Sequence, residues 1–240
     1  MNVIPSAAPQ NWLEGCIAAH RRLDAVVTSL SDEMARRPSL LAEWTVGHLL
    51  THLARNADSH TGMVVAAQRG EVGPQYPGGP AQRAADIAAG QGRPAVELAS
   101  DVRMANERLE QAWAATGEEV WARGVGRPKS GPKTIAELVF RRWREVEIHL
   151  IDLGLVELGS PDWDGLSAAY VDAEWDETLA RLPDRVPDRL TLVLVPGDRP
   201  SRAYGHGAEL EMVQASPGRI LGWLFVRGGD PAWPALRPWE

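Results

Sequence analysis

Residues 134–154 constrain the fold most strongly, because they describe one long helix whose buried surface carries charged side chains. Thr134 is followed three residues later by Glu137, the pattern of a capping box at a helix start, and Gly154 stands where the helix would end. Glu145 and His149 lie four residues apart, so they share one face of this helix. A carboxylate and an imidazole on a face suited to burial require a partner in the core.

A second segment supplies candidate partners for that pair. We predict a helix over residues 46–68, with Thr45 as its N-cap and Gly70 just beyond its end. Four polar residues follow one another along this helix at four-residue spacing: His48, His52, Asn56 and His60. Antiparallel helices of a bundle bring such inward stripes together, and bundle cores are where metal sites are built.

Two imidazoles and one carboxylate form a ligand set that suits zinc, with a fourth position left open. Non-haem iron uses the same ligand set, so the identity of the metal stays open. The pair also fits two simpler structures, a hydrogen-bonded histidine in the core or a surface pair that stabilises a helix by about 0.2–0.5 kcal/mol. Spacing alone does not decide between a metal site and such a pair.

The rest of the chain divides into a helical part and a mixed part. The other predicted elements are helices at 13–30, 94–115 and 166–182, strands at 189–195 and 208–214, and a short helix from Ser216 to about Arg227. Gly- and Pro-rich loops are predicted at 73–80 and 123–133. We therefore expect an α+β fold, with a four-helix bundle in a domain of residues 1–158 and a small α+β domain of residues 159–240.

Composition excludes several classes of partner. The net charge of −7 argues against nucleic acid, which requires clustered Lys and Arg. No segment approaches the roughly 18 uncharged apolar residues of a membrane span, and the N-terminus lacks the basic start and apolar run of a signal peptide. The single cysteine, Cys16, cannot form an internal disulfide. We expect a cytoplasmic monomer that binds neither nucleic acid nor membranes.

The sequence EWTVGHLLTHLARNA at 43–57 and the sequence RRWREVEIHLIDLG at 141–154 carry the two halves of the polar pattern. Both resemble the metal-bearing segments of the mycothiol-dependent maleylpyruvate isomerase family, which belongs to the DinB-like four-helix superfamily. The resemblance extends to a loop, PQYPGGPAQRAADI at 74–87, to VRGGD at 226–230 and to a tail ending in Arg-Pro-Trp. It implies a DinB-like four-helix bundle followed by the small α+β domain.

The same resemblance implies a set of functional residues. The zinc ligands of the family fall on three residues of this chain: His52, Glu145 and His149. The active-site arginine falls on Arg227. Arg83, in the matching loop, and Asn56, beside the first ligand, are candidates for binding the cofactor. The implied reaction converts maleylpyruvate to fumarylpyruvate by reversible addition of a thiolate, with Zn²⁺ and mycothiol as cofactors and a small unsaturated acid as substrate.

Several residues near these positions receive a structural interpretation. Cys16 lies on an apolar helix face and is interpreted as a buried structural cysteine, so the thiol must come from outside the chain. Three neighbouring arginines are interpreted as a solvated helix face: Arg141, Arg142 and Arg144. Glu147 is expected to face away from Glu145 and His149, and Asp152 is a candidate partner for a metal ligand.

Three other functions stay open from the residues alone. A mycothiol S-transferase would use the same metal residues on another electrophile. A metal-dependent hydrolase would activate water instead, and it would need a general base near the open position. A non-catalytic metal-binding module would need a conspicuous partner surface, and the sequence shows none.

Overall fold

The computed structural model describes residues 7–239 and divides into two compact units, with the division between Ser160 and Pro161. Residues 1–6, part of the segment for which no signal peptide is predicted, and residue 240 lie outside the described residues. The domain limits predicted from the sequence, 1–158 and 159–240, stay predictions. No helix within the described range is both long enough and apolar enough to cross a membrane.

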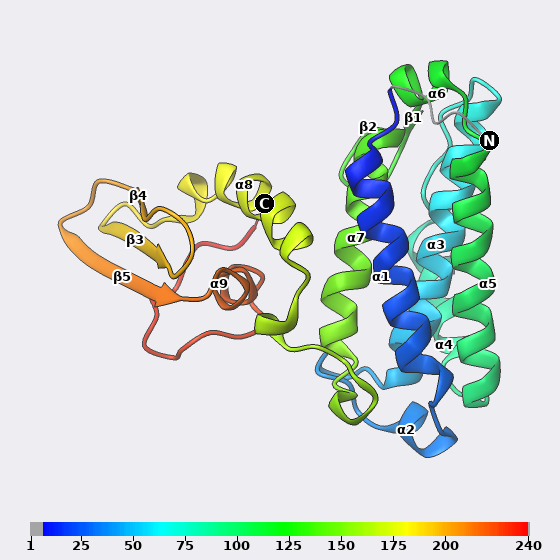
Figure 1. Cartoon of the computed structure of the whole chain (residues 1–240), viewed down its shortest axis with the longest axis horizontal. Coiled ribbons are helices and arrows are strands. Elements are labelled where there is room, and N and C mark those ends of the chain that lie inside the picture. The colour runs from blue at the N-terminus through cyan, green and yellow to red at the C-terminus, as the bar shows by residue number, and fades with distance from the viewer. Residues whose placement is uncertain (1–6, 240) are drawn as a thin grey trace. The chain divides into compact units, whose positions relative to one another are not determined.

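The first unit is a four-helix bundle (Figure 1). Around the bundle each helix packs against the next, in the order α1, α7, α3, α5 and back to α1. The bounds of these helices are α1 (Gln10–Thr28), α3 (Val46–Gln68), α5 (Ala95–Ala114) and α7 (Ile135–Asp152). The ends of α3 agree with the prediction from Thr45 and Gly70, and the other three differ from it by one to three residues at their ends.

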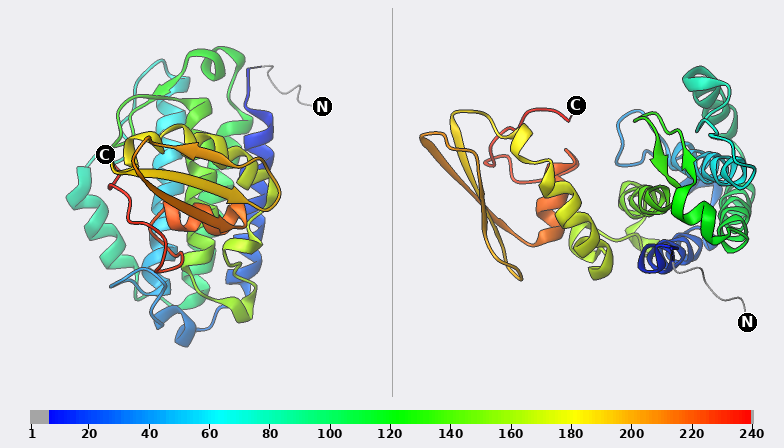
Figure 2. Two further views of the ribbon diagram at one scale, coloured as in Figure 1. Left: turned by 90° about the vertical axis from the view of Figure 1, so that its left-hand side faces the viewer. Right: turned by 90° about the horizontal axis from the view of Figure 1, so that it is seen from above.

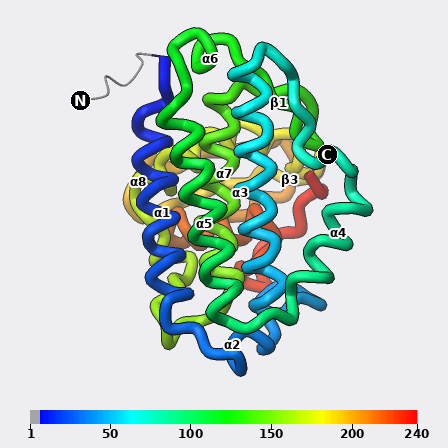
Figure 3. The backbone as a smooth tube through the Cα atoms, turned by 90° about the vertical axis from the view of Figure 1, so that its right-hand side faces the viewer, coloured from blue at the N-terminus to red at the C-terminus, as the bar shows by residue number. Residues whose placement is uncertain are grey.

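A further helix, α4 (Gly79–Gly90), lies against α3 and leads the chain back along the bundle (Figure 3). Because of it, α3 and α5 run in the same direction, while α3 and α7 run in opposite directions. The predicted loop at 73–80 is wrong at its last two residues, Gly79 and Pro80, and no helix was predicted over the rest of α4. Pro80 is tolerated because it lies in the first turn, where a backbone N–H has no partner within the helix.

Short elements close the two ends of the bundle. They are α2 (Asp32–Arg36), α6 (Glu118–Arg123) and the antiparallel pair β1 (Val125–Gly126) and β2 (Lys133–Thr134). The sequence predicted only a loop at 123–133, and the two strands are too short for a periodic signal. Gly126 lets β1 approach the bundle closely, since a Cβ there would lie 2.8 Å from Leu138 Cδ1 and 3.0 Å from Met63 Cβ.

Helices α3 and α7, which carry the candidate ligands, both begin with a capping box. The sequence predicted this capping box for α7. On α7, the Thr134 hydroxyl accepts the Glu137 N–H and Glu137 Oε2 accepts the Thr134 N–H, at 3.1 and 2.8 Å. On α3, Thr45 accepts the His48 N–H, and His48 Nδ1 accepts the Thr45 N–H at 3.1 Å. His48 therefore acts as a helix cap.

The second unit is a three-stranded sheet with helices on one face (Figure 2). Central strand β3 (Leu190–Pro196) pairs antiparallel with β4 (Arg202–Tyr204) and parallel with β5 (Glu209–Ala215). Side chains of β3 are buried at alternate positions, as expected for a half-covered strand. Helix α8 (Ala168–Ala180) packs on α9 (Pro217–Leu224), which contacts β5. The described residues also form 3₁₀ turns at Val156–Leu158 in the first unit and at Trp163–Gly165 and Pro183–Arg185 in the second. The α+β class is confirmed, and β4 was not predicted.

Candidate metal centre and its cavity

The fold brings three sequence-predicted residues to one point between α3 and α7: His52, Glu145 and His149. One potential ligand atom from each lies within 4.8 Å of the others. Glu145 Oε2 is 3.0 Å from His52 Nε2 and 3.5 Å from His149 Nε2. The helices α3 and α7 run antiparallel and pack together (Figure 3). Their packing places His52 beside Glu145 and His149, which lie one turn apart on α7.

The protonation states of the three side chains are set by burial and by each other. Both histidines are buried, and Glu145 is about one-third exposed. Burial lowers the pKa of His52, which leaves the ring neutral and able to offer a lone pair. Burial opposes ionisation of Glu145, but hydrogen bonds with His149 and His52 outweigh it and hold its pKa well below the usual value. For His149, burial is outweighed by the bonds to Asp152 and Glu145, which raise its pKa.

Asp152 completes the arrangement from outside. Its Oδ2 lies 2.9 Å from His149 Nδ1, and only 2% of the residue is exposed. An N–H at Nδ1 that donates to this carboxylate leaves the Nε2 lone pair pointing to the Glu145 side, the arrangement found around metal-bound histidines. Two imidazoles, one carboxylate and an outer carboxylate therefore fit a divalent cation.

A cavity of about 590 Å³ opens beside these ligands, within the first unit. His52 and Glu145 line it, together with two other members of the polar stripe, Asn56 and His60. Four cationic side chains also line it: Arg83, Arg127, Lys129 and Arg141. Glu145 and these four cations leave an excess of positive charge, so the cavity suits an anionic ligand.

Arg127 and Lys129 are residues that the sequence analysis missed. The Arg127 N–H donates to Gly73 O at 2.9 Å, and Arg127 O accepts the Gln75 N–H at 3.0 Å. These bonds join the segment after β1 to the segment after α3, across the cavity wall. The Gly, Pro and Lys composition of 123–133 indicated a loop but not its partner, so no sequence signal placed these cations near His52.

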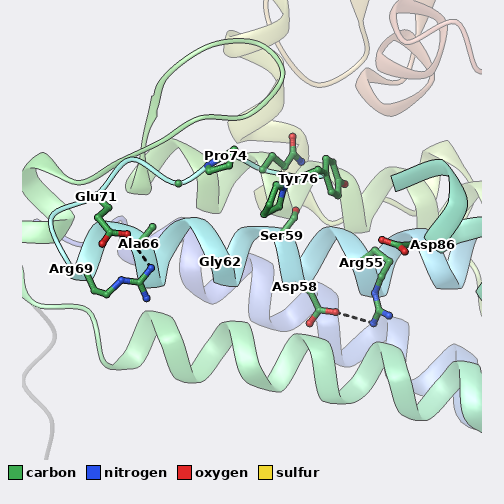
Figure 4. Close-up of a pocket in the computed structure, with 13 residues that line it drawn as sticks. Arg55, Asp58, Ser59, Gly62, Ala66, Arg69, Glu71, Pro74, Tyr76 and Asp86 are labelled. Atoms are coloured by element: carbon green, nitrogen blue, oxygen red, sulfur yellow. Dashed lines mark hydrogen bonds and ion pairs between the residues drawn. The ribbon is translucent and has the colours of Figure 1, made fainter. Parts of the chain in front are cut away.

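A second cavity, of about 460 Å³, shares three lining residues with the first: Pro74, Gln75 and Tyr76 (Figure 4). Its arginines are neutralised within its own wall. Arg55 is 2.8 Å from Asp58, and Arg69 is 3.1 Å from Glu71. Of the two cavities, the one beside the candidate ligands therefore has the stronger attraction for anions.

The other predicted site residues fall in different places. Arg83 lines the first cavity, with Nη2 3.0 Å from His52 Nδ1. Asn56 lines the same cavity, and only 2% of it is exposed. Arg227 lies in the second unit, in the exposed turn after α9, where its Nη1 is 3.4 Å from Phe225 O. The roles predicted for these three residues stay predictions.

Two structural interpretations are confirmed, and one needs correction. Cys16 is fully buried, and burial raises the pKa of its thiol. Glu147 turns away from the cavity, where its Oε1 accepts Trp143 Nε1–H at 2.8 Å and pairs with Arg22. The solvated arginine face is wrong for Arg142, which is 0% exposed. It points into the bundle because its helix position lies on the core side, where neutral acceptors surround it.

Comparisons with known proteins identify the family of the chain. Residues 16–154, more than half of the chain, match the family model of the mycothiol maleylpyruvate isomerase N-terminal domain. The chain belongs to this family. No curated protein matches the chain in sequence.

Two solved structures resemble this chain in fold. One is a crystal structure of the mycothiol-dependent maleylpyruvate isomerase, with 22% identity, a TM-score of 0.79 and coverage of 95% of this chain and 91% of that one. The other is a histidine-to-alanine mutant of the mycothiol-dependent maleylpyruvate isomerase, with the same identity and coverage and a TM-score of 0.78. At this identity the likeness shows the fold.

Proposed function

We propose that this protein is a metal- and mycothiol-dependent cis–trans isomerase that converts maleylpyruvate to fumarylpyruvate. The observation that carries the proposal is the convergence of His52, Glu145 and His149 beside a cavity with an excess of positive charge. Family membership supports a thiol cofactor, and the fold shared with an isomerase of that name supports the reaction.

Three protein ligands with a fourth position open are the arrangement of a catalytic zinc site. A Zn²⁺ ion held there would supply deprotonation of a coordinated thiol, whose free pKa near 8.5 leaves it mostly protonated at neutral pH. Cys16 does not offer that thiol, because it is sealed in the core of the bundle. The thiol therefore enters from solution, which fits mycothiol.

The cationic wall fits the substrate, which carries a carboxylate at each end. Arg127 and Lys129 have no ion-pair partner among residues 7–239, so their charges are available to a ligand. A guanidinium binds a carboxylate through two parallel hydrogen bonds, and an ammonium acts as a point charge. These side chains would hold the substrate with its double bond beside the metal ligands.

The contact between Arg83 and His52 depends on which nitrogen of the His52 ring carries the proton. Arginine is only a donor, so its contact at 3.0 Å requires His52 Nδ1 to accept. A cation bound at His52 Nε2 would require the ring proton on Nδ1, and the two N–H groups would then repel. With a metal at this site, Arg83 would therefore lose its contact with His52 and would be available in the cavity to bind the thiol cofactor or a carboxylate.

Arg227 is the proposed contribution of the second unit. It follows Val226, whose φ of 59° is unusual for a β-branched residue. The Arg227 N–H bonds to Gly222 O at 2.9 Å and the Val226 N–H to Trp223 O at 2.9 Å, a helix-ending motif in which glycine is usual. A strained, ordered turn that presents an arginine supports a functional role for that side chain.

The test is to follow maleylpyruvate by NMR with the purified enzyme, with and without mycothiol, and with and without a chelator. We expect fumarylpyruvate to form only when both thiol and metal are present. Accumulation of a stable thiol conjugate would indicate the S-transferase instead. Hydrolysis without thiol would indicate the hydrolase, and no conversion under any condition would contradict all three.

A further inference from the structure

The least expected group in the bundle core is the guanidinium of Arg142. It is fully buried, yet every hydrogen-bond partner of its side chain is neutral. Nη1 donates to Leu53 O at 3.1 Å and to Asn56 Oδ1 at 2.8 Å, while Nη2 donates to Asn106 Oδ1 at 2.7 Å. A buried cation without a directly bonded carboxylate is costly, so its presence calls for an explanation.

The rest of the Arg142 network is satisfied and rigid. Nε donates to His20 Nε2 at 3.2 Å, which places the His20 proton on Nδ1, 2.7 Å from Glu110 Oε1. Burial lowers the pKa of His20 to about 4, so this ring stays neutral at physiological pH. Four hydrogen bonds hold the Arg142 guanidinium in one orientation, and its two Nη atoms fix the side chains of Asn56 and Asn106.

The hydrogen bond from Arg142 determines the orientation of the Asn56 side-chain amide, and so which of its two polar atoms is free to face the cavity. Because arginine only donates, the Asn56 atom that meets it must be the carbonyl oxygen. The amide NH₂ is then the end that remains. Among the described residues, none accepts a hydrogen bond from Asn56 Nδ2. This nitrogen is also not one of the buried side-chain atoms that lack a hydrogen-bond partner. The side chain lines the cavity that His52 and Glu145 also line.

We propose that Asn56 is a catalytic residue that donates a hydrogen bond from Nδ2 to the carbonyl oxygen of the unsaturated ligand, and that Arg142 is the positioning residue that aims it. This inference rests on the proposed function, which supplies the thiol. When a thiolate adds to a double bond conjugated with a carbonyl, the sulfur electron pair forms the C–S bond. The π pair of the former double bond moves to form the enolate C=C bond, and the π pair of the carbonyl moves onto its oxygen, which gains the negative charge. The former double bond is now a single bond and can rotate. Elimination reverses these electron shifts, and no proton is exchanged.

A fixed donor at that oxygen stabilises the charge where it develops, and it costs no reorganisation because Arg142 has already oriented it. His60, the next member of the stripe, shows that the cavity wall still lacks polar partners. Its Nδ1 is buried without a hydrogen bond, although the ring lines the cavity. A ligand with several oxygens would supply such partners.

The test compares Asn56→Asp with Asn106→Asp. Both substitutions place a carboxylate against Arg142, but only the first removes an NH₂ group from the cavity, because Asn106 does not line it. We expect Asn56→Asp to lower kcat about 100-fold, the effect of losing one such donor. Asn106→Asp should keep kcat within about threefold of the parent enzyme.

Metal content and thermal unfolding are measured for each variant, and Asn56→Ser provides a neutral substitution that also lacks the amide. Loss of kcat in both Asn56 variants, with metal retained, supports the proposal. Equal kcat in Asn56→Asp, Asn56→Ser and an active parent enzyme overturns it and leaves the proposed function intact. An inactive parent enzyme contradicts the proposed function, and this inference falls with it.

Discussion

His60 shows what the polar stripe costs at the scale of one residue. The side chain is 3% exposed, and burial lowers its pKa from 6.5 to about 3. Between pH 6.5 and pH 3, the His60 ring is therefore protonated in the unfolded chain and neutral in the folded protein. The contribution of His60 to the free energy of unfolding is therefore at its maximum above about pH 6.5, and it decreases as the pH drops toward 3.

We predict that His60→Gln reduces the pH dependence of stability in this window. Each such group contributes a slope of about 1.4 kcal/mol per pH unit, so the variant should show a shallower slope between pH 6 and pH 4 by up to that amount. Urea unfolding at several pH values measures it. Identical slopes in the two proteins would show that His60 titrates normally in the folded state.

The candidate ligands His52, Glu145 and His149 could be predicted from the sequence. The periodicity of the helix that carries each residue places that residue on an inward face. The same reasoning could not place Arg142, since three arginines in four residues leave open which one turns inward. It also could not place Arg127, whose position depends on backbone bonds to Gly73 and Gln75. Such pairings join distant segments and leave no local pattern.

At the scale of elements, the start of α3 is fixed by a close contact. A Cβ on Gly47 would lie 2.1 Å from Gln91 O, just after α4, whereas a Cβ on Gly62 of the same helix would meet nothing within 4 Å. Gly47 therefore allows α3 to dock where it carries His52 toward α7. A backbone oxygen cannot give way as a flexible side chain can.

We predict opposite effects for alanine at these two positions. Gly47→Ala should destabilise the protein by about 1–3 kcal/mol, the usual cost of overpacking. Gly62→Ala should stabilise it by about 0.5–1 kcal/mol, because alanine favours the helix. Thermal unfolding of both variants checks the pair. A neutral Gly47→Ala variant would mean that α3 can shift away from Gln91.

Helix limits marked by a start or stop signal were predicted well, whereas α4 and the short strands were missed. Thr45, Thr134 and Gly70 fixed the limits of α3 and the start of α7. The Gly and Pro residues before α4 indicated a loop, although Pro80 only occupies the first turn of a helix. Short strands such as β4 (Arg202–Tyr204) are below the length at which alternation can be recognised.

At the scale of the whole molecule, metal binding and turnover are predicted to separate. All three candidate ligands lie in the first unit, and Arg227 lies in the second. Arg227→Ala should retain the metal and lose about 10- to 100-fold in kcat/KM, because a hydrogen bond to a charged group contributes about 1.5–3 kcal/mol. Arg189→Ala, an exposed arginine on the same unit, is the control and should keep full activity.

An Arg227→Ala variant with normal turnover would limit the site to the first unit. The substrate carboxylates would then be held by the cationic wall alone. Monomeric state and cytoplasmic location stay predictions from the sequence at this scale.

The most direct test is the metal content per chain, by mass spectrometry, of protein purified without added metal. His149→Ala is measured beside it, with His60→Gln as a control on the same cavity. We predict one zinc per chain in the parent protein and in His60→Gln, and none in His149→Ala. Absence of metal from the parent protein, even after zinc is offered, would reduce Glu145 and His149 to a hydrogen-bonded pair in the core.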